Sequence, residues 1–199
     1  MSKTDLIYPE EGELVVVTVH SVKQNGADVS LDEYEGVDGF IFIGEIASGW
    51  IKNIRRFVRE GHRLVCKVMP SRRDGSSLKL SLKSVSEERR RDRLQQWKNE
   101  QRALQLFKVL SESQKWDTDF AAELQTELMQ VFETLYGAFE EAAMHEGSIV
   151  DAGFEGDWIQ PFIELAVENI IPPYVEIRGI LNLKVETSNG VETLSLIHI

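Results

Sequence analysis

A group of basic side chains near the middle of the chain lies next to an indole ring; its members are Trp50, Lys52, Arg55, Arg56 and Arg59. A Lys or Arg that neutralises a phosphate releases counterions, and an aromatic ring can stack on a base or a ribose. The combination therefore predicts contact with an RNA backbone. Arg72 and Arg73, in a predicted turn of the same basic segment, are added to these candidate RNA contacts. A loop that is charged only for solubility would have the same composition, and this alternative stays open.

The charge of the whole chain is strongly segregated. Its 199 residues have a formal net charge of −11, yet residues 52–108 contain 17 basic and 6 acidic side chains. Residues 1–51 contain 2 basic and 10 acidic side chains, and residues 109–199 contain 3 and 17. A cationic block between two anionic ones favours a localised binding surface for a polyanion. For the arginines that begin a predicted helix, at 89, 90, 91 and 93, simple exposure to solvent is the better interpretation.

No set of residues suited to catalysis or metal binding emerges. His20, His62 and His145 are scattered without ligand spacing, and the single cysteine, Cys66, excludes disulfide frameworks and multi-cysteine metal sites. The apolar stretches fall far short of the roughly 20 residues that a membrane span needs. We therefore expect a cytoplasmic protein that is not an enzyme, holds no cofactor or metal and does not enter a membrane.

The segment before residue 83 predicts a small β-barrel. Short β-rich runs separated by glycines occur at 14–22, 27–31, 38–42, 62–70 and 77–82. Asn25-Gly26 lies between the first two runs, where we expect a tight turn with positive φ. The basic residues fall in a stretch without alternation, 47–59, which predicts a long connecting loop with a helical turn.

After Leu82 the apolar residues recur with the period of a helix. Ser84 and Ser86 are candidate N-caps of a first helix, and further helices are predicted from about 117 to 144 and from 157 to 169. Two prolines, Pro172 and Pro173, end the helical part, and strand-like residues follow. We predict a multi-domain α+β protein with a barrel at 1–84, a helical domain at 85–172 and the truncated start of an α/β domain at 173–199. The final residues, 194–199, are given no function.

The spacing of several short motifs resembles the S1 class of OB-fold RNA-binding domains; the motifs are Gly26-Ala27, residues 36–41, Glu45-Ile46 and Ser81-Leu82. Longer stretches, 12–68 and 77–98, resemble the alpha subunits of archaeal translation initiation factor 2. The loop at 47–55, Pro172-Pro173 and Ile177-Arg178-Gly179 support that resemblance.

The resemblance implies a non-catalytic role in a heterotrimer that brings methionylated initiator tRNA to the small ribosomal subunit. In that family the gamma subunit is the GTPase, and the C-terminal domain of alpha docks on gamma; beta is the third subunit. No phosphate loop of the G-x-x-x-x-G-K-S/T kind occurs, so GTP is not expected to bind this chain. Candidate partner-binding residues lie in the third domain, at Ile177, Arg178, Ile180, Leu181 and Leu183.

Three positions depart from related patterns. Generic S1 domains commonly carry an aromatic residue and a histidine where this chain has Asp28 and Phe42. Because Asp28 would repel phosphate, we expect backbone or shape contact in place of base stacking. Eukaryotic relatives have a regulatory phosphoserine where our alignment places Asn53, which cannot accept a phosphate. An alternative function is an S1 accessory subunit of an RNA-processing or transcription complex.

Overall fold

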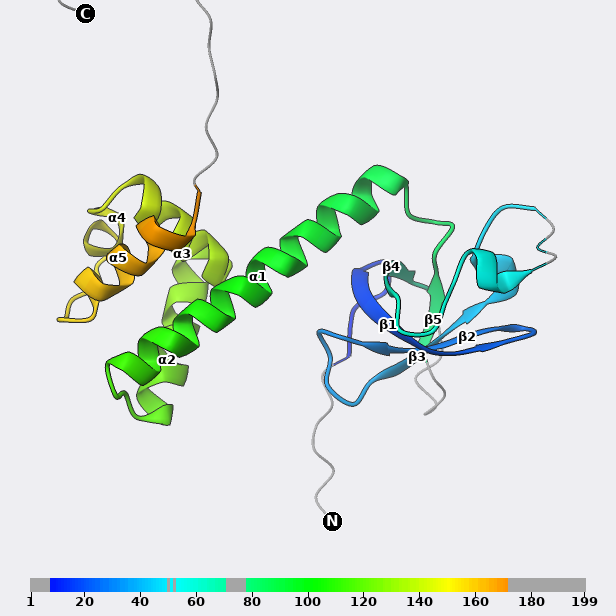
Figure 1. Cartoon of the computed structure of the whole chain (residues 1–199), viewed down its shortest axis with the longest axis horizontal. Coiled ribbons are helices and arrows are strands. Elements are labelled where there is room, and N and C mark those ends of the chain that lie inside the picture. Colours follow the sequence, from blue (N-terminus) through cyan, green and yellow to red (C-terminus); the bar gives the residue numbers. More distant parts are fainter. Residues whose placement is uncertain (1–7, 50, 52, 71–77, 172–199) are drawn as a thin grey trace, which may run out of the picture.

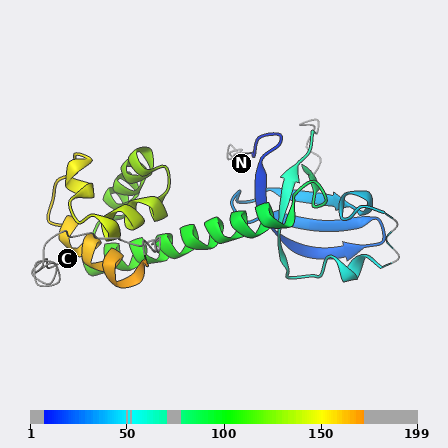
Figure 2. The ribbon, with the colours of Figure 1, turned by 90° about the horizontal axis from the view of Figure 1, so that it is seen from above.

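The residues that the structure describes fold into two bodies joined by one long helix (Figure 1). The structure, a computed structural model, describes residues 8–49, 51, 53–70 and 78–171. The N-terminal body is a β-barrel, and the other is a bundle of helices. Seen from above, the joining helix leaves the barrel as a rod and forms part of the helical body (Figure 2).

Five strands close the barrel: β1 (Leu14–Lys23), β2 (Gly26–Leu31), β3 (Asp38–Phe42), β4 (Arg63–Val68) and β5 (Leu78–Ser81). They follow the order β1-β2-β3-β5-β4, and β4 pairs with β1 to complete the circle. All pairs are antiparallel except β3 with β5. The predicted barrel and the positions of its strands are therefore confirmed.

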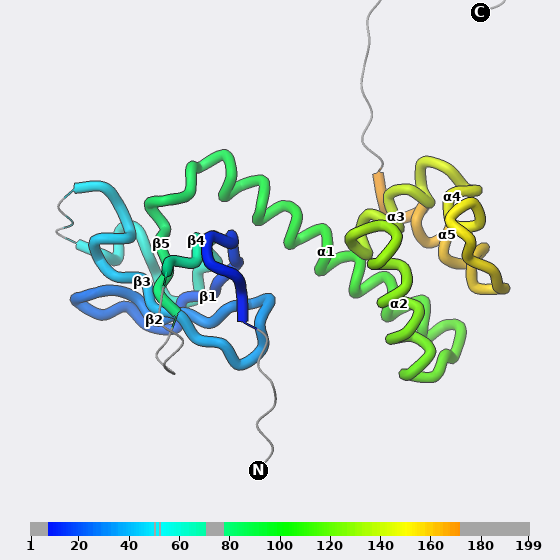
Figure 3. Tube along the Cα trace, turned by 180° about the vertical axis from the view of Figure 1, so that it is seen from behind, coloured from blue at the N-terminus to red at the C-terminus, as the bar shows by residue number. Residues whose placement is uncertain are grey.

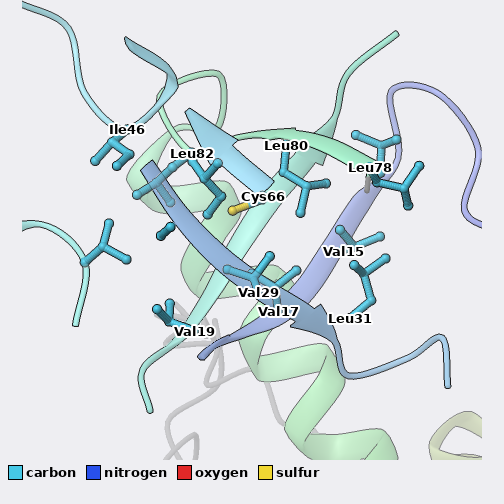
Figure 4. Close-up of a cluster of buried hydrophobic side chains, with 14 of the residues drawn as sticks. Val15, Val17, Val19, Val29, Leu31, Ile46, Cys66, Leu78, Leu80 and Leu82 are labelled. Atoms are coloured by element: carbon cyan, nitrogen blue, oxygen red, sulfur yellow. The ribbon is translucent and has the colours of Figure 1, made fainter. Parts of the chain in front are cut away.

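Alternation along β1 explains both faces of the barrel wall. Val15, Val17 and Val19 point into the barrel core, where they meet residues such as Leu80 (Figure 4). Val16 points outward but is also fully buried, because the first helix covers it. One strand thus contributes to two separate apolar clusters.

The turn between β1 and β2 differs from the prediction. Gly26 pairs with Lys23 as the first residue of β2, and neither Asn25 nor Gly26 has a positive φ. Glycine is needed here because a Cβ at position 26 would lie 2.2 Å from the carbonyl oxygen of Ile41 and 2.5 Å from the ring of Phe40. Close packing against β3 accounts for this glycine, and the expectation of a positive φ was wrong.

The helical body contains five helices: α1 (Glu87–Ser113), α2 (Thr118–Phe132), α3 (Leu135–Met144), α4 (Ser148–Asp151) and α5 (Ile159–Asn169). Ser86 caps α1 by accepting from the Arg89 amide, and Asp117 caps α2. Phe139 and Phe162 stack in the core with ring centroids 4.2 Å apart. None of the described helices combines the length with the apolar composition that a membrane-spanning segment requires.

The second predicted helix is in fact two. The backbone of Glu133 has φ +63°, which breaks the helix between α2 and α3. Thr134 then caps α3 by accepting from the Gly137 amide at 2.9 Å. The carboxylate of Glu100, on α1, accepts from two further amides of this first turn. The helical spacing of apolar residues continues across this point through Phe132 and Leu135, so the pattern did not predict the break.

The N-terminal half of α1 fixes the helix to the barrel. Its Trp97, with Leu94, packs on the outward cluster around Val16, and the guanidinium of Arg63 lies 4.6 Å from the centre of the Trp97 ring. Arg93 donates to the carbonyl oxygen of Leu14 at 3.1 Å. We propose that the barrel domain ends at residue 84 and that the helical domain spans residues 85–172.

Candidate nucleic-acid interface

The loop that carries the predicted RNA contacts lies at the end of the barrel farthest from the helical body (Figure 3). The connection between β3 and β4 contains two short 3-10 turns, η1 (Ile43–Glu45) before this loop and η2 (Ile54–Arg56) within it. Asn53 caps η2 by accepting from the Arg55 amide at 3.0 Å. Val58 and Ile46 anchor the loop in the barrel core. The predicted loop with a helical turn is therefore confirmed.

The three described arginines of this loop, Arg55, Arg56 and Arg59, are exposed. Among the described residues none of them forms an ion pair. Five other cations of the barrel and of the start of α1 are paired with carboxylates within the chain; they are Lys23, Arg63, Lys83, Arg90 and Arg93. Since paired cations are already compensated, the loop arginines are the better candidates for an external phosphate.

Two open hollows flank Arg55. One, of about 340 Å³, is lined by Val22, Arg55, Arg59 and Glu60. The other, of about 500 Å³, joins Arg55 and Asn53 to the end of β1 and to Ile43, the residue after β3. The surface is concave on both sides of the arginine.

The carboxylate of Asp28 is compensated within the barrel. Lys23 lies 2.7 Å from it, and the Ser21 hydroxyl donates to it. These hydrogen bonds, from Lys23 first and Ser21 second, lower the pKa of Asp28 below its ordinary value. Asp28 is thus ionised but paired, so its repulsion of phosphate is weaker than the sequence suggests. The same pairing occupies Lys23.

Sequence reasoning missed the aromatic residues of β3 as site candidates. Phe40 and Phe42 form an edge-to-face pair with ring centroids 4.7 Å apart, and Phe42 is 44% exposed. Phe57, beside the arginines, is 50% exposed. The alternation of buried Gly39 and Ile41 with outward phenylalanines was the signal that could have found them.

The arginines at the start of α1 divide into two groups. Arg90 donates to the carbonyl oxygens of Leu82 and Val85, and Arg93 donates to Leu14 and binds Glu33. These two side chains hold the helix to the barrel, a use that charge patterning did not predict. Arg89 and Arg91 are exposed.

Several predicted site residues lie outside the described residues. They are Trp50, Lys52, Arg72 and Arg73 for RNA, and Ile177, Arg178, Ile180, Leu181 and Leu183 for a partner.

Within the described parts of the chain, no three His, Cys, Asp or Glu side chains gather as metal ligands. Cys66 is fully buried, and burial raises the pKa of its thiol to about 12.

A closed five-stranded barrel in this order, with one parallel pair between β3 and β5, is an OB-fold, a class that uses its outer strands and loops to hold oligomeric ligands. A family model described as eukaryotic translation initiation factor 2 alpha subunit matches residues 120–195. Translation initiation factor 2 subunit alpha of Methanopyrus kandleri is 43% identical over 189 residues, which cover 94% of this chain and 71% of the relative. The corresponding subunit of Archaeoglobus fulgidus is 42% identical over 188 residues, covering 94% and 70%.

Solved structures agree. The intact alpha subunit of aIF2 from Pyrococcus abyssi matches with a TM-score of 0.72 and 33% identity, over 94% of this chain and 72% of that one. An a/eIF2alpha–aDim2p–rRNA complex from Pyrococcus horikoshii matches with a TM-score of 0.70 and 33% identity, over 84% of this chain and all of that one. The chain belongs to the family of archaeal translation initiation factor 2 alpha subunits, which confirms the resemblance found in the sequence.

Proposed function

We propose that this subunit contacts RNA through the free end of its barrel and so helps a heterotrimeric factor bring initiator methionyl-tRNA to the small ribosomal subunit. The observation that carries the proposal is the set of three exposed arginines, Arg55, Arg56 and Arg59, which form no ion pair among the described residues. The exposed rings of Phe57, in the same loop, and of Phe42, at the end of β3, add surfaces on which a base can stack. The relative from Pyrococcus horikoshii, found in a complex with rRNA, supports it.

The arginines would position RNA by its phosphates, and an exposed ring would stack on a base. Neither contact selects a base by its hydrogen-bonding edge, so we expect weak sequence preference. Asn53 has its side-chain oxygen engaged in capping η2, which keeps Arg55 at the exposed turn. No bond is made or broken in this role, which the protein would perform in the cytoplasm.

The partners belong to the same proposal. The gamma subunit, a GTPase, would dock on the segment after Pro173 through Ile177, Ile180, Leu181, Leu183 and Arg178, and the beta subunit would complete the factor. Trp50, Lys52, Arg72 and Arg73 would extend the RNA contacts of the described arginines.

Co-purification tests the assembly. The chain would be co-expressed with the gamma and beta subunits of an archaeal relative, and the complex assayed for binding of initiator methionyl-tRNA. We expect the three subunits to elute together, and the double variant Ile180→Asp, Leu181→Asp to lose gamma. Failure of the intact chain to retain gamma, or recovery of exonuclease subunits from an archaeal lysate in its place, would contradict the proposal.

A further inference from the structure

The helical body has a second concave surface, which is lined by acidic side chains whereas the barrel end is lined by arginines. A hollow of about 560 Å³ lies between α2 and the residues that lead into α5. Phe120, Leu124 and Trp158 contribute its apolar part, and Glu123, Glu127 and Glu155 contribute carboxylates. A ring surface and several carboxylates around one hollow are complementary to a cation with an apolar stem.

The carboxylates of this hollow form no ion pair among the described residues. The ion pairs among the described residues leave out Glu123, Glu127 and Glu155, all of which are exposed. None of the residues that line the hollow is basic, and residues 109–171 contain 14 acidic residues and one basic residue, Lys115. A ligand from outside would have to supply the positive charge.

Two of these carboxylates oppose each other at a cost to the helix. Glu123 and Glu127 are four residues apart on α2, so they are neighbours on its surface, and like charges at this spacing destabilise a helix. A bound cation between them would remove that repulsion.

The walls of the hollow are already in place. The indole of Trp158 is 7% exposed and donates to the carbonyl oxygen of Glu155 at 3.2 Å. Phe154 packs edge-to-face on the same indole at 5.9 Å. Gly156 has φ +137°, and a Cβ there would approach the indole to 2.7 Å. Phe120 remains 43% exposed, so its ring is available to a ligand.

We propose that this hollow docks an arginine from a basic segment of a partner protein. Arginine fits best because its planar guanidinium can stack on the Phe120 ring while its N–H groups donate to the carboxylates of Glu123 and Glu127. RNA is disfavoured because phosphates would face an uncompensated acidic surface. The two modules would then bind different partners, RNA at the barrel and a basic protein segment at the helices.

The test uses the whole chain and a fluorescein-labelled Gly-Arg-Gly-Arg-Gly peptide, with binding followed by fluorescence anisotropy at low salt. A peptide in which citrulline replaces arginine has the same shape without the charge. We expect saturable binding of the arginine peptide and at least about tenfold weaker binding of the citrulline peptide. Equal binding of the two peptides would overturn the proposal.

A matched pair of variants locates the site. Glu123→Gln with Glu127→Gln removes two charges at the hollow, and Glu164→Gln with Glu168→Gln removes two exposed charges at the same spacing on α5. Each double variant relieves a like-charge repulsion, so both should fold at least as well as the parent. We expect about tenfold weaker binding for the first and less than twofold change for the second. Equal losses would mean attraction to a diffuse acidic surface and would overturn the proposal.

A second copy of the chain could supply the arginine, because its own barrel loop is basic. Sedimentation velocity decides this point. We expect a monomer over the concentrations used for peptide binding. A dimer that disappears in the Glu123→Gln, Glu127→Gln variant would assign the hollow to self-association and contradict a foreign partner. Binding of RNA should be unchanged in this variant, so the outcome is independent of the barrel.

Discussion

The pairing state of each cation decides what it does in this molecule. Arg93 and Arg55 are both arginines of one basic segment, yet Arg93 is bound to Glu33 whereas Arg55 is exposed and unpaired within the described structure. Composition shows that the segment is basic but cannot distinguish these uses, because the partner of Arg93 lies 60 positions away in the sequence. The same limitation applied to Asp28, whose neighbour Lys23 compensates it.

Removal of an exposed ring tests base stacking at the residue scale. Phe42→Ala should weaken binding of single-stranded RNA by about 1–3 kcal/mol without changing its salt dependence, since the ring carries no charge. Phe120→Ala, at a site of similar exposure on the helical body, is the control and should have no effect. Filter binding at several salt concentrations provides the measurement. A weaker dependence of the binding constant on salt concentration in Phe42→Ala would contradict stacking as the role of this ring.

The buried thiol gives a pH-dependent prediction. Burial raises the pKa of Cys66 from its ordinary value of 9.0 to about 12, so the folded state favours the neutral thiol. The resulting stabilisation is complete below pH 9.0 and is lost progressively as the pH rises toward about 12. At pH 8 we expect 5,5′-dithiobis(2-nitrobenzoic acid) to react with Cys66 only as the barrel unfolds. Rapid labelling of the native protein would contradict the buried position.

At the scale of elements, the sequence predicted helices and strands best where apolar residues alternated, or recurred with the helical period, between residues typical of turns and helix caps. The barrel strands were predicted for this reason, and Ser86, the cap of α1, was one of the two predicted candidates with Ser84. The break at Glu133 was not, because a non-glycine residue with positive φ leaves no mark in the pattern. Phe40 and Phe42 were not predicted as site residues because the site was inferred mainly from charge. The alternation along β3 nevertheless indicates that both rings lie on the outer face of the barrel.

Glu133→Gly should stabilise the helical body. The backbone of Glu133 has φ +63°, a conformation that costs a non-glycine residue on the order of 1–3 kcal/mol, and glycine adopts it freely. The greater freedom of glycine in the unfolded chain offsets about 0.5–1 kcal/mol, which leaves a net gain of about 1 kcal/mol. Urea unfolding followed by circular dichroism measures the change. A loss of stability would show that Glu133 is not strained.

At the scale of the whole molecule, charge separates two surfaces. The barrel end has exposed arginines, whereas 14 of the 15 charged side chains at 109–171, counting Lys, Arg, Asp and Glu, are acidic. The helix α1 keeps these surfaces apart (Figure 2). Sequence composition predicted the segregation, but only the fold shows that the two surfaces lie at opposite ends of the described structure.

The joint between α1 and the barrel should respond to loss of one ion pair. Arg93 and Glu33 have side chains that are 24% and 23% exposed, so their attraction is only partly screened. A double-mutant cycle with Arg93→Gln and Glu33→Gln should give a coupling free energy of about 1 kcal/mol in unfolding. A cycle on Lys108 and Glu112, which are more exposed and 3.9 Å apart, should give less. Equal coupling in both cycles would contradict a role for Arg93 in the joint.

The salt dependence of RNA binding tests the central claim, that the barrel loop holds RNA through its phosphates. The triple variant Arg55→Ala, Arg56→Ala, Arg59→Ala would be compared with Arg89→Ala, Arg91→Ala, Lys98→Ala, which removes three exposed cations from α1. The logarithm of the binding constant for initiator tRNA would be plotted against that of the salt concentration. We expect the magnitude of the slope to decrease by about 2 to 3 in the loop variant and by clearly less in the α1 variant. An unchanged slope in the loop variant, or an equal decrease in both, would contradict this claim.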